Sequence, residues 1–181
     1  MAERVPSFPG RHWVERMLSA LPRGATILDL GCGGGEPVAR YVISRGFCVV
    51  GIDLAESAIN LARTRFPRER WIKGDMRSVV LDGPFAGVIA WRSLTWLSHA
   101  DQALMATRAA AWLAPGGRLL FNLEPIHDPA EQDYRVGTPY RAELEAANYT
   151  AEIARRELIL TDHIASDPTC AGAGVWLARK P

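Results

Sequence analysis

The sequence predicts an α/β fold, with a mostly parallel sheet covered by helices on both sides. Short apolar runs bounded by glycine, proline and acidic residues alternate along the chain with segments that carry apolar residues at helical spacing. One of these runs, residues 85–91, is almost wholly apolar, which is typical of a strand buried on both faces. Strands separated by helices form right-handed crossover units, and these units place the strands parallel to one another.

The first part of the chain contains three expected strands and three expected helices. A short helix is expected around residues 11–13, close to the N-terminus. The helix after the first strand has Pro37 in its first turn, and Gly46 ends it. Pro67 ends the next helix. The strands are expected at residues 25–30, 47–52 and 71–73, and the two longer helices at residues 38–45 and 55–66.

The rest of the chain continues the pattern. After the strand at 85–91, Ser98 can cap a helix over residues 98–113, with Asp101 in its positive first turn. Residues 114–117, Ala-Pro-Gly-Gly, are expected to break this helix before a strand at 118–123. No regular structure is expected for residues 124–139. A helix at 140–156 and strands at 158–164 and 174–178 complete the expected elements.

Composition limits the class of protein. The 181 residues are 48% hydrophobic and 23% charged, which fits one globular domain. Lys and Arg number 21 against 20 Asp and Glu, so no basic field favours nucleic acid or an anionic membrane. The three cysteines form no Cys-x-x-Cys pair, which argues against a zinc site or a disulfide framework. No run approaches the ~20 apolar residues of a membrane span, and the first residues lack a signal-peptide core. We therefore expect a cytoplasmic protein without a bound metal.

The most informative segment is the glycine-rich turn after the first expected strand. It reads Gly-Cys-Gly-Gly-Gly over residues 31–35, and missing Cβ atoms let a ligand approach such a backbone closely. Asp29 lies inside the motif, and Glu36 stands where a dinucleotide-binding turn has its third glycine. The turn therefore favours a cationic or neutral ligand, and Glu36 argues against a nicotinamide-dependent oxidoreductase.

Acidic residues mark three successive strand ends: Asp29, Asp53 and Asp75. Asp53 follows Gly31 at about the ~20-residue spacing of an acid that binds ribose hydroxyls. Asp75 can accept a hydrogen bond from an exocyclic amino group, while Leu54 and Met76 offer apolar surface to a base. Taken singly, each acid can equally be a helix cap or a turn residue, and the glycines a tight turn. Their joint order predicts one elongated ligand at the carboxyl ends of the strands.

Five blocks of sequence, in order, resemble the class I S-adenosylmethionine-dependent methyltransferases. They are Asp-Leu-Gly-Cys-Gly-Gly-Gly, Val-Val-Gly-Ile-Asp, Lys-Gly-Asp-Met, Phe-Ala-Gly-Val-Ile-Ala and Leu-Ala-Pro-Gly-Gly-Arg-Leu-Leu-Phe, between about residues 25 and 123. The resemblance implies a Rossmann-like, doubly wound, seven-stranded mixed sheet of order 3-2-1-4-5-7-6 with strand 7 antiparallel. It implies a single domain over residues 1–181, with a short N-terminal cap helix (1–24), a cofactor-binding half (25–123), and a lid with the C-terminal strands (124–181).

The resemblance also implies how the cofactor S-adenosylmethionine is held. Gly31 and Gly33 would line its methionine part, Asp53 would take the ribose hydroxyls, and Asp75 would take adenine N6. The complete set of expected cofactor-binding residues is Asp29, Gly31, Cys32, Gly33, Asp53, Leu54, Asp75, Met76 and Trp91.

Residues that could contact the methyl acceptor follow the fourth and fifth strands: Trp91, Arg92, Trp96, His127, Tyr134, Tyr140 and Arg141. Several of them have a second interpretation. Trp91 and Trp96 belong either to the core or to a stacking wall, and Arg92 either binds an acidic substrate or lies in solvent at the strand end. The weak catalytic candidates are His127, Tyr140 and Arg141.

The three catalytic candidates are considered in turn. His127 is either a base near neutral pH or a loop histidine. Tyr140 either lines a pocket or packs the lid. The C-terminal part resembles a group of small family members in which a histidine commonly stands at the position of Arg141. That departure weakens any transfer of a catalytic role to Arg141.

We therefore predict a methyltransferase that acts on a small soluble molecule, as a monomer or a homodimer. The Asn/Asp-Pro-Pro-aromatic signature of enzymes that methylate nucleic-acid bases is absent, because Trp-Arg-Ser-Leu stands after the fourth strand. The alternative is a domain that binds S-adenosylmethionine without catalysis.

Overall fold

The fold is built on one seven-stranded sheet. The computed structural model describes residues 7–123 and 142–181. The strand order is β3-β2-β1-β4-β5-β7-β6, which confirms the predicted topology. The strands are β1 (Thr26–Leu30), β2 (Cys48–Asp53), β3 (Arg70–Lys73), β4 (Phe85–Ala90), β5 (Leu113–Leu123), β6 (Ile159–Asp167) and β7 (Ala173–Arg179).

Strand directions place a ligand site beside β1. The neighbouring pairs from β3 through β5 are parallel, and β7 runs antiparallel to both β5 and β6, as predicted. The order of the strands reverses at β1, which pairs with β2 on one side and with β4 on the other. The segments that follow β1 and β4 therefore diverge, and the carboxyl ends of these strands are the expected place for a ligand.

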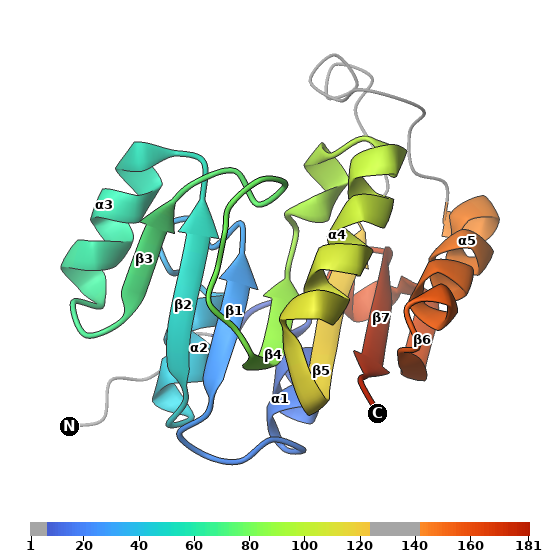
Figure 1. Ribbon diagram of the computed structural model, residues 1–181, viewed down its shortest axis with the longest axis horizontal. Coiled ribbons are helices and arrows are strands. Elements are labelled where there is room, and N and C mark those ends of the chain that lie inside the picture. Colours follow the sequence, from blue (N-terminus) through green and yellow to red (C-terminus); the bar gives the residue numbers. More distant parts are fainter. Residues whose placement is uncertain (1–6, 124–141) are drawn as a thin grey trace.

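Helices cover both faces of the sheet. The helices α1 (Arg11–Leu18), α2 (Val38–Ser44) and α3 (Glu56–Arg65) bury Met17, Tyr41 and Ile59 in one core cluster. The helices α4 (His99–Trp112) and α5 (Ala142–Arg155) bury Met105 and Ile153 in the cluster of the opposite face. In Figure 1, α4 and α5 lie in front of the sheet, and α1 and α2 lie behind it.

The main difference from the sequence prediction is the start of β5. The helix before it ends at Trp112, and the strand begins at Leu113 rather than at residue 118. Leu113 pairs with Phe85, and a register shift precedes the pairing of Gly87 with Arg118. The strand starts at Leu113 because this side chain, directly after the helix, is buried in the sheet. Residues 114–117 therefore lie within the strand, as an irregularity between two paired segments. The other predicted strands and the four longer helices are found, with ends shifted by at most three residues.

The helices of the described part of the chain are all too short or too polar to cross a membrane.

Candidate functional site

The glycine-rich turn is held against the end of β2. The N–H groups of Gly31 and Cys32 donate to the Ile52 carbonyl at 2.8 and 3.0 Å. The next N–H, that of Gly33, donates to Oδ2 of Asp53 at 2.9 Å. Gly31 has a φ of +75°, and a Cβ there would lie 2.4 Å from the Cβ of Ser93. Glycine is required at this position both by the backbone conformation and by the space.

Asp53 joins the turn to helix α3. While Oδ2 accepts the Gly33 N–H, Oδ1 accepts the N–H of Ala55 at the start of α3. An ionised carboxylate has about four acceptor positions, so this pairing leaves capacity for two further donors. Leu54, the residue after Asp53, is 67% exposed. Asp53 is therefore both a helix-start residue and a carboxylate that can accept bonds from a ligand.

Asp75 lies at the end of β3 and pairs with Arg77. Its Oδ1 accepts the Arg77 N–H at 2.9 Å, and its Oδ2 accepts from the guanidinium at 2.6 Å. Arg77 also pairs with Asp101 of α4 at 3.1 Å. The Arg77 side chain holds the pKa of Asp75 below its usual value. Met76 packs against the core close to Gly31.

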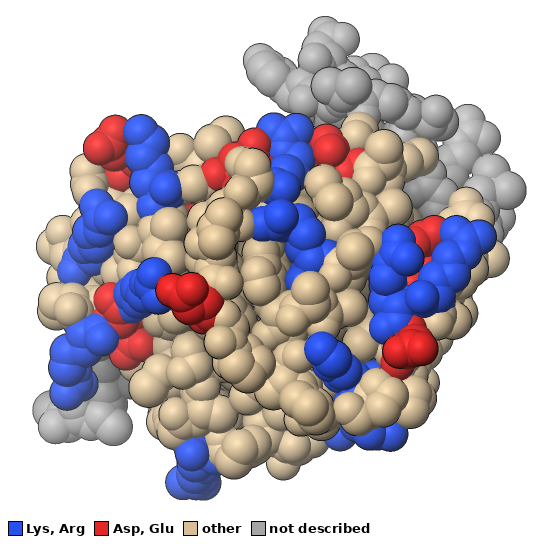
Figure 2. Space-filling view, in the orientation of Figure 1, with Lys and Arg blue, Asp and Glu red and all other residues tan. Residues whose placement is uncertain are grey.

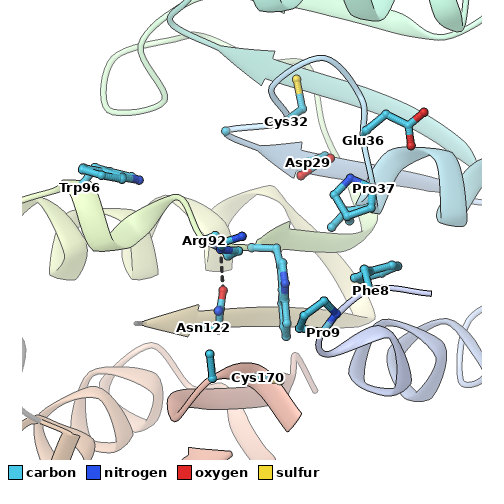
Figure 3. A pocket seen from close by; sticks show the side chains of 14 residues that line it. Phe8, Pro9, Asp29, Cys32, Glu36, Pro37, Arg92, Trp96, Asn122 and Cys170 are labelled. Carbon is cyan, nitrogen blue, oxygen red and sulfur yellow. Dashed lines mark hydrogen bonds between the residues drawn. The ribbon is translucent and has the colours of Figure 1, made fainter. Parts of the chain in front are cut away.

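A cavity of about 420 Å³ lies beside the glycine-rich turn. Six parts of the chain form its walls: the segment before α1, the end of β1, the turn with the start of α2, the residues after β4, β5, and the 3₁₀ turn Pro168–Cys170 with the residue after it (Figure 3). The lining residues are Phe8, Pro9, Asp29, Gly31, Cys32, Glu36, Pro37, Val38, Trp91, Arg92, Trp96, Asn122, Cys170 and Ala171.

The cavity gathers some of the predicted cofactor residues and leaves others outside. Those that line it are Asp29, Gly31, Cys32 and Trp91. The others lie beyond this cavity: Gly33 in the glycine-rich turn, Asp53 and Leu54 at the end of β2 and after it, and Asp75 and Met76 after β3. The set therefore extends from the cavity across the ends of three neighbouring strands.

Electrostatics near the turn disfavour an anionic ligand. Asp29 is only 4% exposed, and its burial, together with the nearby Asp53 carboxylate, raises its pKa to about 7. Burial, and then the charges of Asp29 and Asp53, raise the pKa of the Cys32 thiol far above its usual value. A further negative charge here would be repelled, whereas a neutral or cationic group is favoured.

The end of β4 forms the wall opposite the turn. Trp91 is 8% exposed and lines the cavity, so it is both packed and available to a ligand. Its ring lies close to Gly10, where a Cβ would be 2.0 Å from Cζ2 of Trp91. Trp96 is 52% exposed and belongs to the wall, and not to the core. Arg92 is exposed, and its N–H donates to Oδ1 of Asn122 at 2.6 Å.

Sequence reasoning missed Phe8, Asn122 and Cys170 as cavity residues. The sequence could have indicated Asn122, because a single amide between apolar neighbours at the end of a buried strand is unusual. Phe8 and Cys170 had none, because only the folded chain brings its two ends together. The candidates His127, Tyr134, Tyr140 and Arg141 lie outside the described residues.

Comparisons with known proteins agree with this geometry. Residues 27–117 match the family model described as "Methyltransferase domain". The chain is 33% identical to a putative methyltransferase, YqeM, of Bacillus subtilis, over 71% of this chain and 54% of that protein. It is 31% identical to the S-adenosyl-L-methionine-dependent Diels-Alderase iliD of a Neonectria species, over 86% of this chain and 64% of that protein. It therefore spans less than two thirds of the length of either relative.

Solved structures share the fold. The S-adenosylmethionine-bound structure of CalS10, an amino pentose methyltransferase from Micromonospora echinaspora, superimposes with a TM-score of 0.73 at 21% identity. The match covers 95% of this chain and 90% of CalS10. The match to the family model, the order of the strands and the glycine-rich turn lead to one conclusion. This chain belongs to the class I S-adenosylmethionine-dependent methyltransferases.

Proposed function

We propose that this domain transfers a methyl group from S-adenosylmethionine to a small-molecule acceptor. The observation that carries the proposal is the bond from the Gly33 N–H to Asp53, which joins the glycine-rich turn to the next strand end beside an open cavity. S-adenosylmethionine supplies an activated methyl group on a sulfonium sulfur. The task of the protein is then to position the two reactants, which is worth up to about 7–11 kcal/mol.

The residues present fit this cofactor. A Cβ at Gly33 would meet nothing within 4 Å, so the backbone faces open space that a ligand can enter. The partly buried Asp53 retains acceptor positions for two hydroxyl groups. We assign the methionine part to Gly31 and Gly33 and the ribose to Asp53. Asp75 would hold the adenine amino group in place of one of the four hydrogen bonds that it accepts from Arg77.

The same model assigns the remaining predicted residues. Leu54 and Met76 would lie against the adenine ring, and Asp29, Cys32 and Trp91 would form the wall near the sulfur. The carboxyl groups of Asp29 and Asp53 near this wall favour a neutral or cationic group, which suits a sulfonium. These side chains bind and orient, and the buried ones exclude water from the reacting atoms.

The size of the cavity supports a small-molecule acceptor that shares it with part of the cofactor. Its 420 Å³ lies within the range of about 300–1,000 Å³ that small-molecule sites occupy. Basic and acidic side chains are intermixed over the face drawn in Figure 2, rather than gathered into a basic band. A nucleic-acid partner would need such a band. With the sequence features given above, this supports a cytoplasmic enzyme acting on a soluble metabolite.

The proposal is tested by binding of S-adenosylhomocysteine, measured by titration calorimetry and thermal shift. The wild-type protein is expected to bind it and to gain thermal stability, and NAD is expected to have no effect. The variant Asp53→Asn loses charge-assisted bonds to the ribose, so its affinity is expected to fall about tenfold or more. Asp82→Asn, an exposed acid away from the site, is the matched control. No binding by the wild-type protein would refute the proposed function.

A further inference from the structure

Arg77 fills the acceptor positions of Asp75. The N–H and the Nε of Arg77 donate to Oδ1 at 2.9 and 3.0 Å, and its Nε and Nη2 donate to Oδ2 at 3.1 and 2.6 Å. An ionised carboxylate has about four acceptor positions, so these hydrogen bonds occupy all of them. A ligand that donates a hydrogen bond to Asp75 must therefore displace one that Arg77 makes.

A second carboxylate lies within reach of the same guanidinium. Nη1 of Arg77 donates to Oδ2 of Asp101, which lies 24 positions later in the chain, at 3.1 Å. Asp101 is in the first turn of α4, and its side chain accepts no other hydrogen bond in the described part of the chain. Its remaining acceptor positions can therefore take further N–H groups of Arg77. A guanidinium has five N–H donors in one plane, which suits a shift from one carboxylate to another.

The side chains of this cluster can exchange partners while the backbone stays in place. The side chain of Arg77 is 42% exposed, and those of Asp75 and Asp101 are each 29% exposed. Ion pairs this exposed are weak, because water competes for both partners. The backbone is fixed, since the Asp75 carbonyl accepts the N–H groups of Ser78 and Val79. Val79 also packs in the core cluster that α4 covers, in front of the sheet in Figure 1.

We propose that Arg77 competes with the adenine amino group of the cofactor for Asp75, and that Asp101 takes over the guanidinium when the cofactor binds. This inference rests on the proposed methyltransferase function, in which Asp75 holds that amino group. Arg77 and Asp101 act through Asp75, so they are positioning residues that set the affinity for the cofactor.

The test measures the affinity of variants for S-adenosylhomocysteine by titration calorimetry. Arg77→Met removes the hydrogen bonds of the side chain, so this variant is expected to bind about threefold or more tightly than the wild type. Arg68→Met removes another exposed arginine, as the control for net charge, and is expected to bind as the wild type does. Asp101→Asn is expected to weaken binding about threefold, because a neutral amide attracts the displaced guanidinium less strongly.

A double variant tests whether the two residues act together. Without the guanidinium, Asp101 has no side chain to take over. The double variant with Arg77→Met and Asp101→Asn is therefore expected to bind S-adenosylhomocysteine as tightly as Arg77→Met alone.

A matched ligand tests whether the adenine amino group is the competitor. S-inosylhomocysteine carries a carbonyl oxygen in place of that amino group, so it has no donor for Asp75 at this position. Its affinity is expected to be the same in Arg77→Met and in the wild type. The preference of Arg77→Met for S-adenosylhomocysteine over this ligand is therefore expected to be about threefold or more above that of the wild type.

Four results would overturn the inference and leave the methyltransferase proposal intact. In the first, Arg77→Met binds S-adenosylhomocysteine less tightly and loses the preference for it, which would mean that Arg77 supports Asp75 as an acceptor. In the second, Arg77→Met binds both ligands as the wild type does. In the third, it gains affinity for both ligands equally. In the fourth, Asp101→Asn binds S-adenosylhomocysteine as tightly as the wild type.

Two controls complete the test. The melting temperature of each variant without ligand shows whether it is folded, and Asp101→Asn, with its opposite expected effect, tests the inference independently of Arg77→Met. Failure of the wild-type protein to bind S-adenosylhomocysteine would instead remove the proposed function, and the inference with it.

Discussion

The indole N–H of Trp13 donates a 2.6 Å hydrogen bond to Oδ2 of Asp167, a residue 154 positions later in the chain. Asp167 is 4% exposed and also accepts from the backbone and hydroxyl of Thr169 and from the thiol of Cys170. Burial alone would raise the pKa of Asp167, but these bonds lower it to about 2. The bond joins α1 to the 3₁₀ turn, and both flank the cavity through Phe8 and Cys170.

Trp13→Phe is expected to lower the free energy of unfolding by about 1–3 kcal/mol, because a buried carboxylate loses a donor. Urea denaturation measures this change. The control is Trp112→Phe. That tryptophan is similarly buried, but its indole N–H meets no acceptor in the described part of the chain, so the variant changes packing and the contact of Arg108 over the ring without removing a hydrogen bond. Equal losses in the two variants would show that the bond to Asp167 contributes nothing beyond packing.

Asp29→Asn is expected to gain stability relative to the wild type as the pH rises from about 4 to 7. The pKa of Asp29 is 3.8 in the unfolded chain and about 7 in the fold, so between these values the folded state binds more protons. Wild-type stability therefore falls with rising pH in this window, and the neutral amide removes that fall. Denaturation at several pH values measures the difference, and a constant difference would contradict the prediction.

Asp167→Asn is a control for Asp29→Asn, because its effect on stability changes with pH in the opposite direction. Because the pKa of Asp167 falls from 3.8 to about 2 on folding, its carboxylate stabilises the fold above pH 3.8, and this contribution is lost as the pH falls toward 2. The difference in free energy of unfolding between the wild type and this less stable variant should therefore grow as the pH rises from 2 to 4.

Apolar runs and glycine positions are local patterns, so the sequence was sufficient for the strands and the glycine-rich turn. The strand order came from the resemblance to the methyltransferase family and is confirmed by the sheet. Residues 114–117 misled the prediction, since Pro-Gly-Gly usually ends an element, whereas here Leu113 already pairs with Phe85. Local sequence patterns could not predict which residues line the cavity. The bonds from Arg92 to Asn122 and from Trp13 to Asp167 join residues 30 and 154 positions apart, and only tertiary packing brings them together.

Gly31→Ala is expected to destabilise the fold more than Gly24→Ala. Both glycines have positive φ, of 75° and 80°, so both variants carry a backbone penalty of about 1–2 kcal/mol. A Cβ at Gly24 meets nothing within 4 Å, whereas one at Gly31 would lie 2.4 Å from the Cβ of Ser93. Overpacking adds about 1–3 kcal/mol at Gly31 alone. Thermal denaturation of the two variants gives this difference, and similar values would show that the turn shifts freely.

Thiol labelling is expected to modify one cysteine quickly in the folded protein. Cys48 is exposed at the start of β2, whereas Cys32 and Cys170 are 5% and 3% exposed. Burial and the neighbouring carboxylates of Asp29 and Asp53 raise the pKa of Cys32, which keeps it protonated, and the thiolate is the reactive form. With Ellman's reagent at pH 8, Cys48→Ser should remove the fast phase and leave the slow one. A fast phase that persists in this variant would mean that Cys32 or Cys170, which line the cavity, is accessible to the reagent.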